Sequence, residues 1–153
     1  MKKINVGLIG LGTIGTGVVR ILRGNSALIT RRLGASLSLK RIADLDLERN
    51  RGIRVERKIL TRNARDIIND PGIDIVVELI GGYEPAKTYI LESLKAGKSI
   101  VTANKALLAQ DGDTIFELAG MAGLEVGFEA SVGGGIPIIR SLNEGFVGNK
   151  IQS

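Results

Sequence analysis

The sequence predicts an α/β protein built on a doubly wound parallel sheet. Apolar runs typical of buried strands alternate along the chain with segments of helical periodicity. Strands that alternate with helices imply right-handed crossovers and a parallel sheet covered on both faces. A second observation is the glycine-rich turn GLGTIG at 10–15, which joins the first expected strand to the first expected helix. This junction is typical of dinucleotide-binding folds, so we expect a Rossmann-like sheet.

The glycine turn matches the pattern G-x-G-x-x-G, and each glycine has a physical task. Gly10 permits the sharp turn off the strand, Gly12 lets backbone N–H groups approach a pyrophosphate, and Gly15 lets the helix pack closely on the strand. The phosphates then lie at the helix N-terminus, where unpaired N–H groups and the macrodipole favour anions. The chain holds 21 glycines, so an ordinary turn is the alternative. The flanking strand and helix favour dinucleotide binding.

The expected elements follow one another in order and are bounded by capping and breaking residues. The strands are short apolar or β-branched runs, at 4–9, 37–43, 74–80, 99–102 and 124–130. The helices have apolar residues at helical spacing, directly after the glycine turn and at 26–33, 63–69, 85–96, 113–122 and 136–146. Thr61 can cap the third helix, Pro85 suits the first turn of the fourth, and Gly97 suits its end.

The chain changes character towards its C-terminal end. A glycine-rich connection, SVGGG at 131–135, follows the last of these strands. We therefore expect a dinucleotide-binding domain at 1–135 and the start of a second domain at 136–153. Residues 149–153 would begin a further strand without a partner, which is typical of a truncated chain.

Composition narrows both the class of protein and its chemistry. The 153 residues are 44% apolar and 24% charged, which fits one globular domain with a sizeable core. The sequence contains no cysteine and no histidine, so proton transfer would use Lys, Tyr, Asp, Glu or water. No apolar run approaches the roughly 20 residues that span a membrane, and the charged start leads into a strand rather than a signal peptide. We expect a cytoplasmic protein without a membrane partner.

The net charge of +5 is concentrated in residues 31–65. A nucleic-acid patch is one interpretation of this stretch. The stretch has no aromatic residue for base stacking, however, and it carries Asp44, Asp46, Glu48 and Glu56 among its positive charges. A solvated face that attracts anions is therefore favoured, and we expect no nucleic-acid partner.

An acidic residue at the end of the second strand indicates how adenosine would be held. In this fold an Asp or Glu there hydrogen-bonds the ribose of NAD, whereas a nearby Arg receives the 2′-phosphate of NADP. Asp44 is the candidate, and the extra helix at 26–33 explains why it lies beyond the usual spacing of about 20 residues. Asp46 is an alternative, and Arg49 or Arg51 could reach a phosphate. Asp44 could also simply cap the turn that follows the strand.

Three further segments resemble the homoserine dehydrogenase family. They are VELIGG at 77–82, AGKSIVTANKA at 96–106 and FEASVGGGIP at 128–137. Together with the glycine turn they extend over nearly the whole chain in the family's order, and they are far more specific than G-x-G-x-x-G alone. The resemblance implies reversible hydride transfer between NAD(P)H and aspartate 4-semialdehyde, which gives L-homoserine for the biosynthesis of threonine, methionine and isoleucine.

The resemblance also implies roles for individual residues. The family's catalytic lysine falls on Lys105, which taken alone could be a solvated surface residue. In the family role its ammonium holds the substrate oxygen and stabilises charge or relays a proton during carbonyl reduction. The implied cofactor contacts are the N–H groups of Thr13 and Ile14 at the pyrophosphate, and Gly81, Gly82, Ala103, Asn104 and Lys105 at the nicotinamide end.

A monovalent-cation site, for an ion such as Na⁺, is implied for the glycine-rich connection. In the family such a cation is held largely by backbone carbonyls, and oxygen ligands suit a hard cation. The alternative for this segment is a flexible hinge between domains. The resemblance carries the site over to Glu129, Val132, Gly134 and Ile136.

Two departures from the family refine these expectations. Family members often have a basic residue before the second-strand acid, whereas Ala43 stands here, which favours NAD over NADP. The family also continues with a substrate-binding and dimerisation domain that this chain lacks. We therefore expect the chain to bind NAD(P) with little turnover alone, and the full-length protein to be a homo-oligomer that acts on a small-molecule substrate.

Two alternative functions remain open at this stage. The first is another NAD(P)-dependent oxidoreductase that acts on an amino-acid-derived carbonyl. The second is a non-catalytic module that senses nucleotides or binds nucleic acid, for which the basic stretch at 31–65 is the only support.

Overall fold

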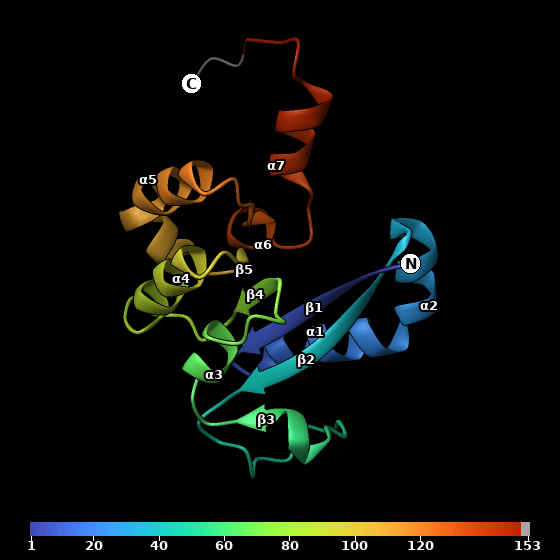
Figure 1. The fold of residues 1–153 in the computed structure, drawn as a ribbon. Helices are drawn as coiled ribbons and strands as arrows, with labels where there is room; N and C mark the ends of the chain where they lie inside the picture. The colour runs from blue at the N-terminus through green and yellow to red at the C-terminus, as the bar shows by residue number, and fades with distance from the viewer. Residues whose placement is uncertain (151–153) are drawn as a thin grey trace.

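The sheet has the doubly wound order expected from the sequence. The computed structural model of the chain describes residues 1–150 (Figure 1). Six strands pair in the order β3-β2-β1-β4-β5-β6, and every neighbouring pair is parallel. The winding direction reverses between β1 and β4, which confirms the Rossmann-like α/β fold. The strands are β1 Lys2–Ile9, β2 Ala35–Ala43, β3 Leu60–Thr61, β4 Ile75–Glu78, β5 Ser99–Thr102 and β6 Val126–Gly127.

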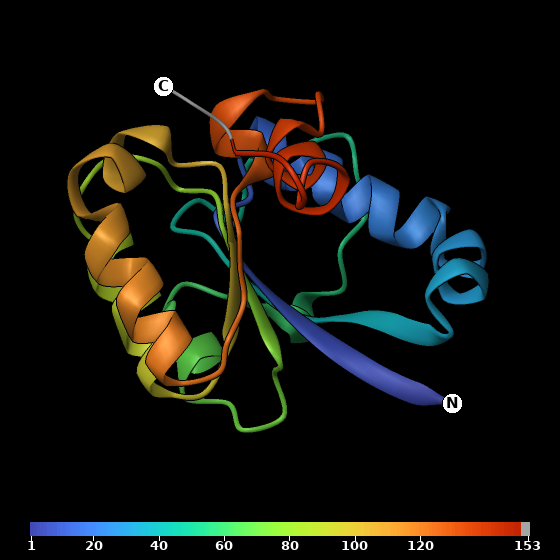
Figure 2. The same ribbon diagram turned by 90° about the horizontal axis from the view of Figure 1, so that it is seen from above.

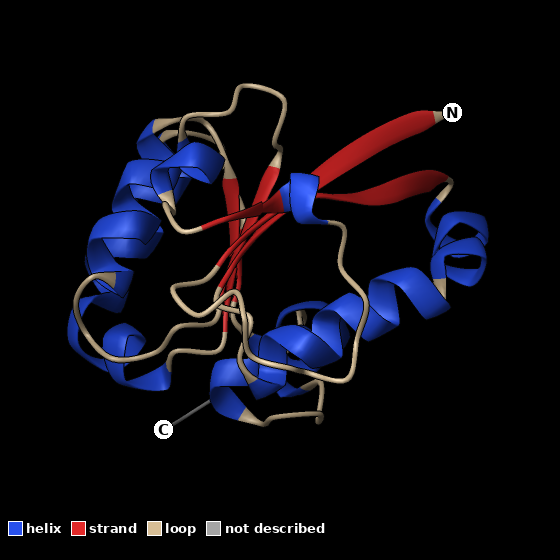
Figure 3. Ribbon diagram, turned by 90° about the horizontal axis from the view of Figure 1, so that it is seen from below, coloured by secondary structure: helices blue, strands red, loops and turns tan. Residues whose placement is uncertain are grey.

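Helices cover both faces of the sheet. The α-helices are α1 Thr13–Gly24, α2 Ser26–Leu33, α3 Arg65–Ile68, α4 Ala86–Lys95, α5 Lys105–Met121, α6 Glu129–Val132 and α7 Ile138–Arg140. A 3₁₀ turn, η1 Arg57–Ile59, precedes β3, and a π-helical turn, η2 Ser141–Gly145, follows α7. Figure 2 shows α4 and α5 on one side of the strands and α1 and α2 on the other, and Figure 3 shows the strands as the layer between them. No helix within residues 1–150 is long and apolar enough to cross a membrane.

The core is divided in two by the sheet, because neighbouring residues of a strand face opposite sides. Ile9 and Val76 belong to a buried cluster with residues of α3, α4 and α5. Leu8 and Val77, their chain neighbours, belong to a second cluster with Val19 of α1. Strands buried on both faces read as continuous apolar runs, which explains why the sequence signalled β1 and β4 clearly.

Some element boundaries differ from the sequence prediction. The helix expected at 113–122 begins eight residues earlier in the chain, at Lys105, because Asn104 caps it: its Oδ1 accepts the Leu107 N–H at 3.2 Å. The backbone kinks at Asp111, which has non-helical angles. The strand expected at 124–130 is limited to β6, and its last two residues, 129 and 130, belong to α6.

The C-terminal expectations are met in part. Helical turns at Ile138–Gly145 match the helix expected at 136–146. Residues 149 and 150 are not in a strand. Residues 151–153, the rest of the strand expected there, lie outside the described residues.

Two carboxylates, Asp70 and Asp111, make the stability of the fold depend on pH. The hydrogen bond from Lys40 Nζ at 2.8 Å, with that from the Gly72 N–H, lowers the pKa of Asp70. The hydrogen bond from Lys87 Nζ at 2.8 Å lowers the pKa of Asp111. A carboxylate whose pKa is lower in the folded state stabilises the fold. This stabilisation is complete at pH values above the unfolded-state pKa of about 4, and it is lost as the pH falls through the folded-state pKa.

We therefore expect the urea midpoint of the chain to fall as the pH is lowered below about 4. The double variant Asp70→Asn/Asp111→Asn should be less stable at neutral pH and should lose less of its remaining stability on acidification. Urea unfolding monitored by circular dichroism at a series of pH values measures both slopes. Identical slopes for the two proteins would show that these ion pairs do not drive acid unfolding.

Candidate functional site

The glycine turn lies at the carboxyl edge of the sheet and has the geometry that its pattern predicts. Gly10 has a positive φ of 100°, and a Cβ there would lie 2.8 Å from the backbone of Leu79. A Cβ on Gly15 would lie 2.1 Å from the Gly10 carbonyl oxygen, so only glycine permits this approach of α1 to the turn. At Gly12, by contrast, no atom of the described residues beyond its chain neighbours lies within 4 Å of a Cβ position.

The N-terminus of α1 fits an anionic group. Gly12 is the N-cap residue, and within residues 1–150 no side chain caps the helix there. The N–H groups of its first turn, which include those of Thr13 and Ile14, are donors without helical partners. Ile14 is exposed, and Thr13 lines a cavity beside the turn. The open space at Gly12 and these donors together fit a pyrophosphate.

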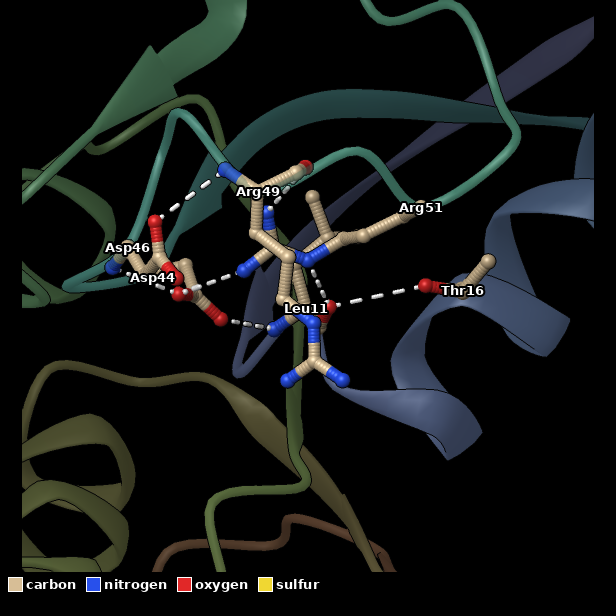
Figure 4. Close-up of polar contacts among 6 residues, drawn as sticks. All are labelled: Leu11, Thr16, Asp44, Asp46, Arg49 and Arg51. Atoms are coloured by element: carbon tan, nitrogen blue, oxygen red, sulfur yellow. Dashed lines mark hydrogen bonds and ion pairs between the residues drawn. The ribbon is translucent and has the colours of Figure 1, made fainter.

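Asp44 reaches the glycine turn from the end of β2 (Figure 4). Its Oδ2 accepts the Leu11 N–H at 2.6 Å, and its Oδ1 accepts the Asp46 N–H at 2.8 Å. The structure thus brings together two sequence-predicted features 33 residues apart. The local turn expected as the alternative role of Asp44 is present as well, through the bond from Asp46. Asp46 itself accepts the Arg49 N–H at 3.1 Å, and its hydrogen-bonded connection to the glycine turn runs through Asp44.

Arg51 and Arg49 differ in their availability. The Arg51 side chain is only 9% exposed: it donates to Asp44 Oδ1 at 3.0 Å and, through Nε, to the Leu11 carbonyl oxygen. Arg49 is exposed, and in Figure 4 its guanidinium points past Leu11 and away from the other residues drawn. Of the two arginines, Arg49 is therefore the one placed to meet an added phosphate.

Two cavities flank the contact between Asp44 and the glycine turn. The first has a volume of about 310 Å³ and is lined by Leu11, Gly12, Thr13, Thr16, Gly17, Arg20, Arg49, Asn50 and Arg51. The second, of about 280 Å³, is more apolar and is lined by Ile9, Ala43, Asp44, Leu45, Arg62, Ala64, Ile80, Gly81, Pro85 and Tyr89. Arg62 and Ile80 are not among the predicted site residues. Ile80 follows β4, so the rule that parallel strands end at one edge would have indicated it. Arg62 follows β3, which the sequence pattern does not predict.

The residues predicted for the nicotinamide end come together beyond β4 and β5. Gly81 and Gly82 both have positive φ, 71° and 72°, and turn the chain away from β4. Asn104 follows β5, and its Nδ2 donates to the Gly82 carbonyl oxygen at 2.6 Å. Lys105, with an exposed side chain, begins α5 directly after Ala103 and Asn104. The sequence pattern thus converges in space, with the candidate lysine facing solvent at the ligand-binding edge.

The four residues of the candidate cation site lie in one short segment: Glu129 and Val132 begin and end α6, and Gly134 and Ile136 lie between α6 and α7. The Glu129 carboxylate accepts the N–H groups of Ile139 at 2.9 Å and Arg140 at 3.2 Å, so its side chain holds the start of α7. Gly134 has a positive φ of 62°. No group of three or more His, Cys, Asp and Glu side chains in residues 1–150 is arranged to hold a metal. A site built from backbone carbonyls would not require one.

Comparison with known proteins identifies the family to which the chain is similar. The family model described as "Homoserine dehydrogenase, NAD binding domain" matches residues 10–129. A homoserine dehydrogenase of Bacillus subtilis is 42% identical over 151 residues, which cover 99% of this chain and 35% of that protein. One of Neisseria gonorrhoeae is 44% identical over 153 residues, which cover 100% of this chain and 35% of that protein.

Solved structures agree. A homoserine dehydrogenase of Thiobacillus denitrificans superimposes with a TM-score of 0.93 at 47% identity, over 99% of this chain and 35% of that one. The chain thus spans about a third of the length of the curated relatives it matches. It belongs to the homoserine dehydrogenase family and corresponds to that family's NAD-binding domain.

Proposed function

We propose that this chain is the cofactor-holding part of an enzyme that transfers hydride between NAD(P)H and aspartate 4-semialdehyde to give L-homoserine. The observation that carries the proposal is the hydrogen bond from Asn104, the residue before Lys105, to the Gly81–Gly82 turn, at the edge where open α/β sheets bind ligands. In this arrangement the Lys105 ammonium is the candidate group that binds the substrate oxygen, and the Gly81–Gly82 turn leaves room for the nicotinamide ring. The family of the chain supports the same reaction.

The chain's own residues hold and orient the reactants in this proposal. The N–H groups of Thr13 and Ile14 bind the pyrophosphate, and Asp44 accepts hydrogen bonds from the adenosine ribose. The apolar cavity of about 280 Å³ between Ala43 and Ile80 suits the adenine ring. The nicotinamide ring, when bound, supplies or accepts the hydride. Lys105 holds the substrate oxygen, neutralises the negative charge that develops on it and relays the proton.

The direct test uses the full-length protein that carries this chain. Incubation with L-homoserine and NAD⁺ or NADP⁺ should produce the reduced cofactor, which absorbance measures continuously. Other amino-acid-derived alcohols, assayed in parallel, test the alternative oxidoreductase. Turnover of one of these in preference to L-homoserine would overturn the proposed substrate and leave the cofactor site standing.

We further propose that NAD is preferred over NADP. Ala43 precedes the acid instead of a basic residue, and the Asp44 carboxylate at the turn repels an added phosphate. Arg51 is already held by Asp44 and Leu11, so it is not free to receive the phosphate. The opposing observation is the exposed Arg49 at the neighbouring cavity.

Calorimetric titration should therefore give NAD⁺ an affinity about tenfold or more above that of NADP⁺, because a single opposed charge contributes on the order of 1 kcal/mol or more at a partly buried site. Asp44→Ser should narrow this ratio, since it removes the repulsion and the ribose acceptor together. Arg49→Ala is the matched variant. If NADP⁺ binds more tightly and Arg49→Ala abolishes that advantage, then Arg49 selects NADP and the proposed preference is wrong.

The remaining assignments concern the surroundings of the cofactor site. We infer a monovalent-cation site, for Na⁺ in particular, on the carbonyls of Glu129, Val132, Gly134 and Ile136, supported by the way the Glu129 carboxylate holds the segment together. Replacing NaCl with choline chloride at constant ionic strength should lower the melting temperature. An unchanged melting temperature would favour the hinge.

The domain division, partners and location are also proposals. A boundary after residue 135 is supported by the glycine-rich connection. A further domain, which would carry the contacts of a homo-oligomer, is supported by the greater length of the relatives. The absence of a nucleic-acid partner is supported by ion pairs in the basic stretch, such as Arg57–Glu48 and Arg65–Glu92. A cytoplasmic location is supported by the small-molecule chemistry proposed here.

A further inference from the structure

Glu78, the last residue of β4, is a fully buried carboxylate at the carboxyl edge of the sheet. Its exposed fraction is 0%, and no lysine or arginine of the described residues forms an ion pair with it. Burying an acid without a cation is costly unless several donors satisfy it. Its Oε1 accepts the N–H groups of Ile80 at 2.8 Å and Gly81 at 3.1 Å. The carboxylate therefore holds the turn that follows β4.

The other oxygen of Glu78 connects β4 to β5. Oε2 accepts a hydrogen bond at 2.7 Å from the hydroxyl of Thr102, the last residue of β5. The same hydroxyl accepts the Asn104 N–H at 3.0 Å, so its own proton is available for Glu78. Asn104 in turn donates to the Gly82 carbonyl oxygen at 2.6 Å. Glu78, the Gly81–Gly82 turn, Asn104 and Thr102 thus form a closed ring of hydrogen bonds.

The ring extends to the neighbouring elements. Asn104 Oδ1 accepts the Leu107 N–H and so fixes the first turn of α5, which Lys105 begins. The Ser131 hydroxyl, from α6, donates to the Thr102 carbonyl oxygen at 2.9 Å. Glu78 and Thr102 are both buried, with 0% and 1% exposure, so the hydrogen bond between them is shielded from competing water, whereas the Gly81–Gly82 turn is exposed.

We propose that Glu78 is a positioning residue: its carboxylate fixes the Gly81–Gly82 turn against Asn104 and thereby sets where Lys105 stands relative to the nicotinamide ring. This inference rests on the proposed function, which gives Lys105 and the turn their roles. An apolar residue at position 78 would satisfy the core, and buried polar groups are often no better for stability than apolar ones. What the carboxylate adds is a defined spacing between the ends of β4 and β5.

Glu78→Gln tests this spacing with little change in shape. The amide oxygen can still accept the N–H groups of Ile80 and Gly81. The amide nitrogen would then face the Thr102 hydroxyl, whose proton loses its acceptor. The variant therefore exchanges the charge-assisted hydrogen bond between the strands for a weaker neutral one, in which the amide donates to the hydroxyl oxygen, and leaves the link to the turn. Thr102→Val removes the link altogether, together with the acceptor of the Asn104 N–H, and Thr102→Ser restores the hydroxyl.

The experiment compares two ligands in the full-length protein. ADP-ribose lacks the nicotinamide ring and reports the distant half of the site, whereas NADH reports both halves. For Glu78→Gln and Thr102→Val we expect ADP-ribose affinity within about twofold of wild type and NADH affinity about tenfold lower. We expect kcat to be about 10²-fold lower, since a displacement of about 1 Å between the reacting groups has this effect on the rate. Thr102→Ser should recover most of both losses.

Lys98→Met provides the matched control for burial. Lys98 is 3% exposed and donates to the Asp70 and Ile73 carbonyl oxygens at 2.6 and 2.9 Å, away from the ring. The Lys98→Met variant should have a lower melting temperature than wild type, with unchanged NADH affinity and kcat. If Glu78→Gln behaves in the same way, Glu78 is only structural and the inference is wrong. If Glu78→Gln does not fold, equal kcat and NADH affinity in Thr102→Val and wild type overturn it.

The proposed function fails by a different result. A wild-type protein that binds neither NADH nor ADP-ribose would overturn the proposed function and this inference with it. A wild-type protein that binds both and turns over, beside a Glu78→Gln variant that does the same equally well, overturns the inference alone.

Discussion

Replacing Lys105 with methionine in the full-length protein is expected to lower kcat for L-homoserine oxidation by about 10²- to 10⁴-fold, the usual contribution of a proton-transferring or charge-stabilising group. The methionine keeps the unbranched apolar stem of the side chain and removes the ammonium. Because Lys105 is exposed, the melting temperature should stay unchanged. Steady-state kinetics and calorimetric titration with NAD⁺ measure turnover and cofactor affinity separately, and the affinity should change by less than about tenfold.

Lys95→Met is the matched control for this prediction. Lys95 is also an exposed helical lysine, but it ends α4, whereas Lys105 begins α5 beyond the carboxyl end of β5. It should retain wild-type kcat and KM. If Lys105→Met keeps more than about a tenth of wild-type kcat, Lys105 is not the group that stabilises the reacting oxygen. The cofactor site would stand, and the catalytic cation would have to come from elsewhere in the protein.

Gly12→Val should abolish dinucleotide binding, with a loss of affinity of about 100-fold or more, and leave the fold intact. No described atom beyond the chain neighbours of Gly12 lies within 4 Å of a Cβ there, so the valine side chain enters the open space where the pyrophosphate would approach. The φ of −71° at Gly12 is accessible to any residue. Titration with NAD⁺ and thermal unfolding, measured on the same preparation, separate binding from folding.

Gly15→Ala, unlike Gly12→Val, should destabilise the fold, because its Cβ would lie 2.1 Å from the Gly10 carbonyl oxygen. We expect a loss of stability of about 1–3 kcal/mol, as for other overpacked sites. Gly24→Ala, at the far end of α1 and in open space, is the control and should leave affinity and stability close to wild type. If Gly12→Val binds NAD⁺ normally, the glycine turn does not hold the pyrophosphate.

The fold class follows from local sequence patterns. Strands β1 and β4 are apolar on both faces, and the glycine turn is contiguous in the chain, so neither requires knowledge of distant residues. The same holds for Asp44, whose place at the end of β2 follows from the strand pattern. The first half of α5 was missed because its start depends on the Asn104 cap and its continuity on a kink at Asp111. β3 was missed because two residues carry too little periodicity to recognise.

The sequence by itself determined the alternation of the longer strands and helices, the glycine turn and the segment that ends in Lys105, because neighbours in the chain encode periodicity and turns. Only the tertiary structure decided that Arg51 is held by Asp44 while Arg49 is exposed, and that Glu78 joins Thr102 across two strands. These partners depend on strand register and on crossovers that bring distant residues together. No local pattern records which side chain will lie opposite, and the ring around Glu78 exists because β4 and β5 pair with Glu78 beside Thr102.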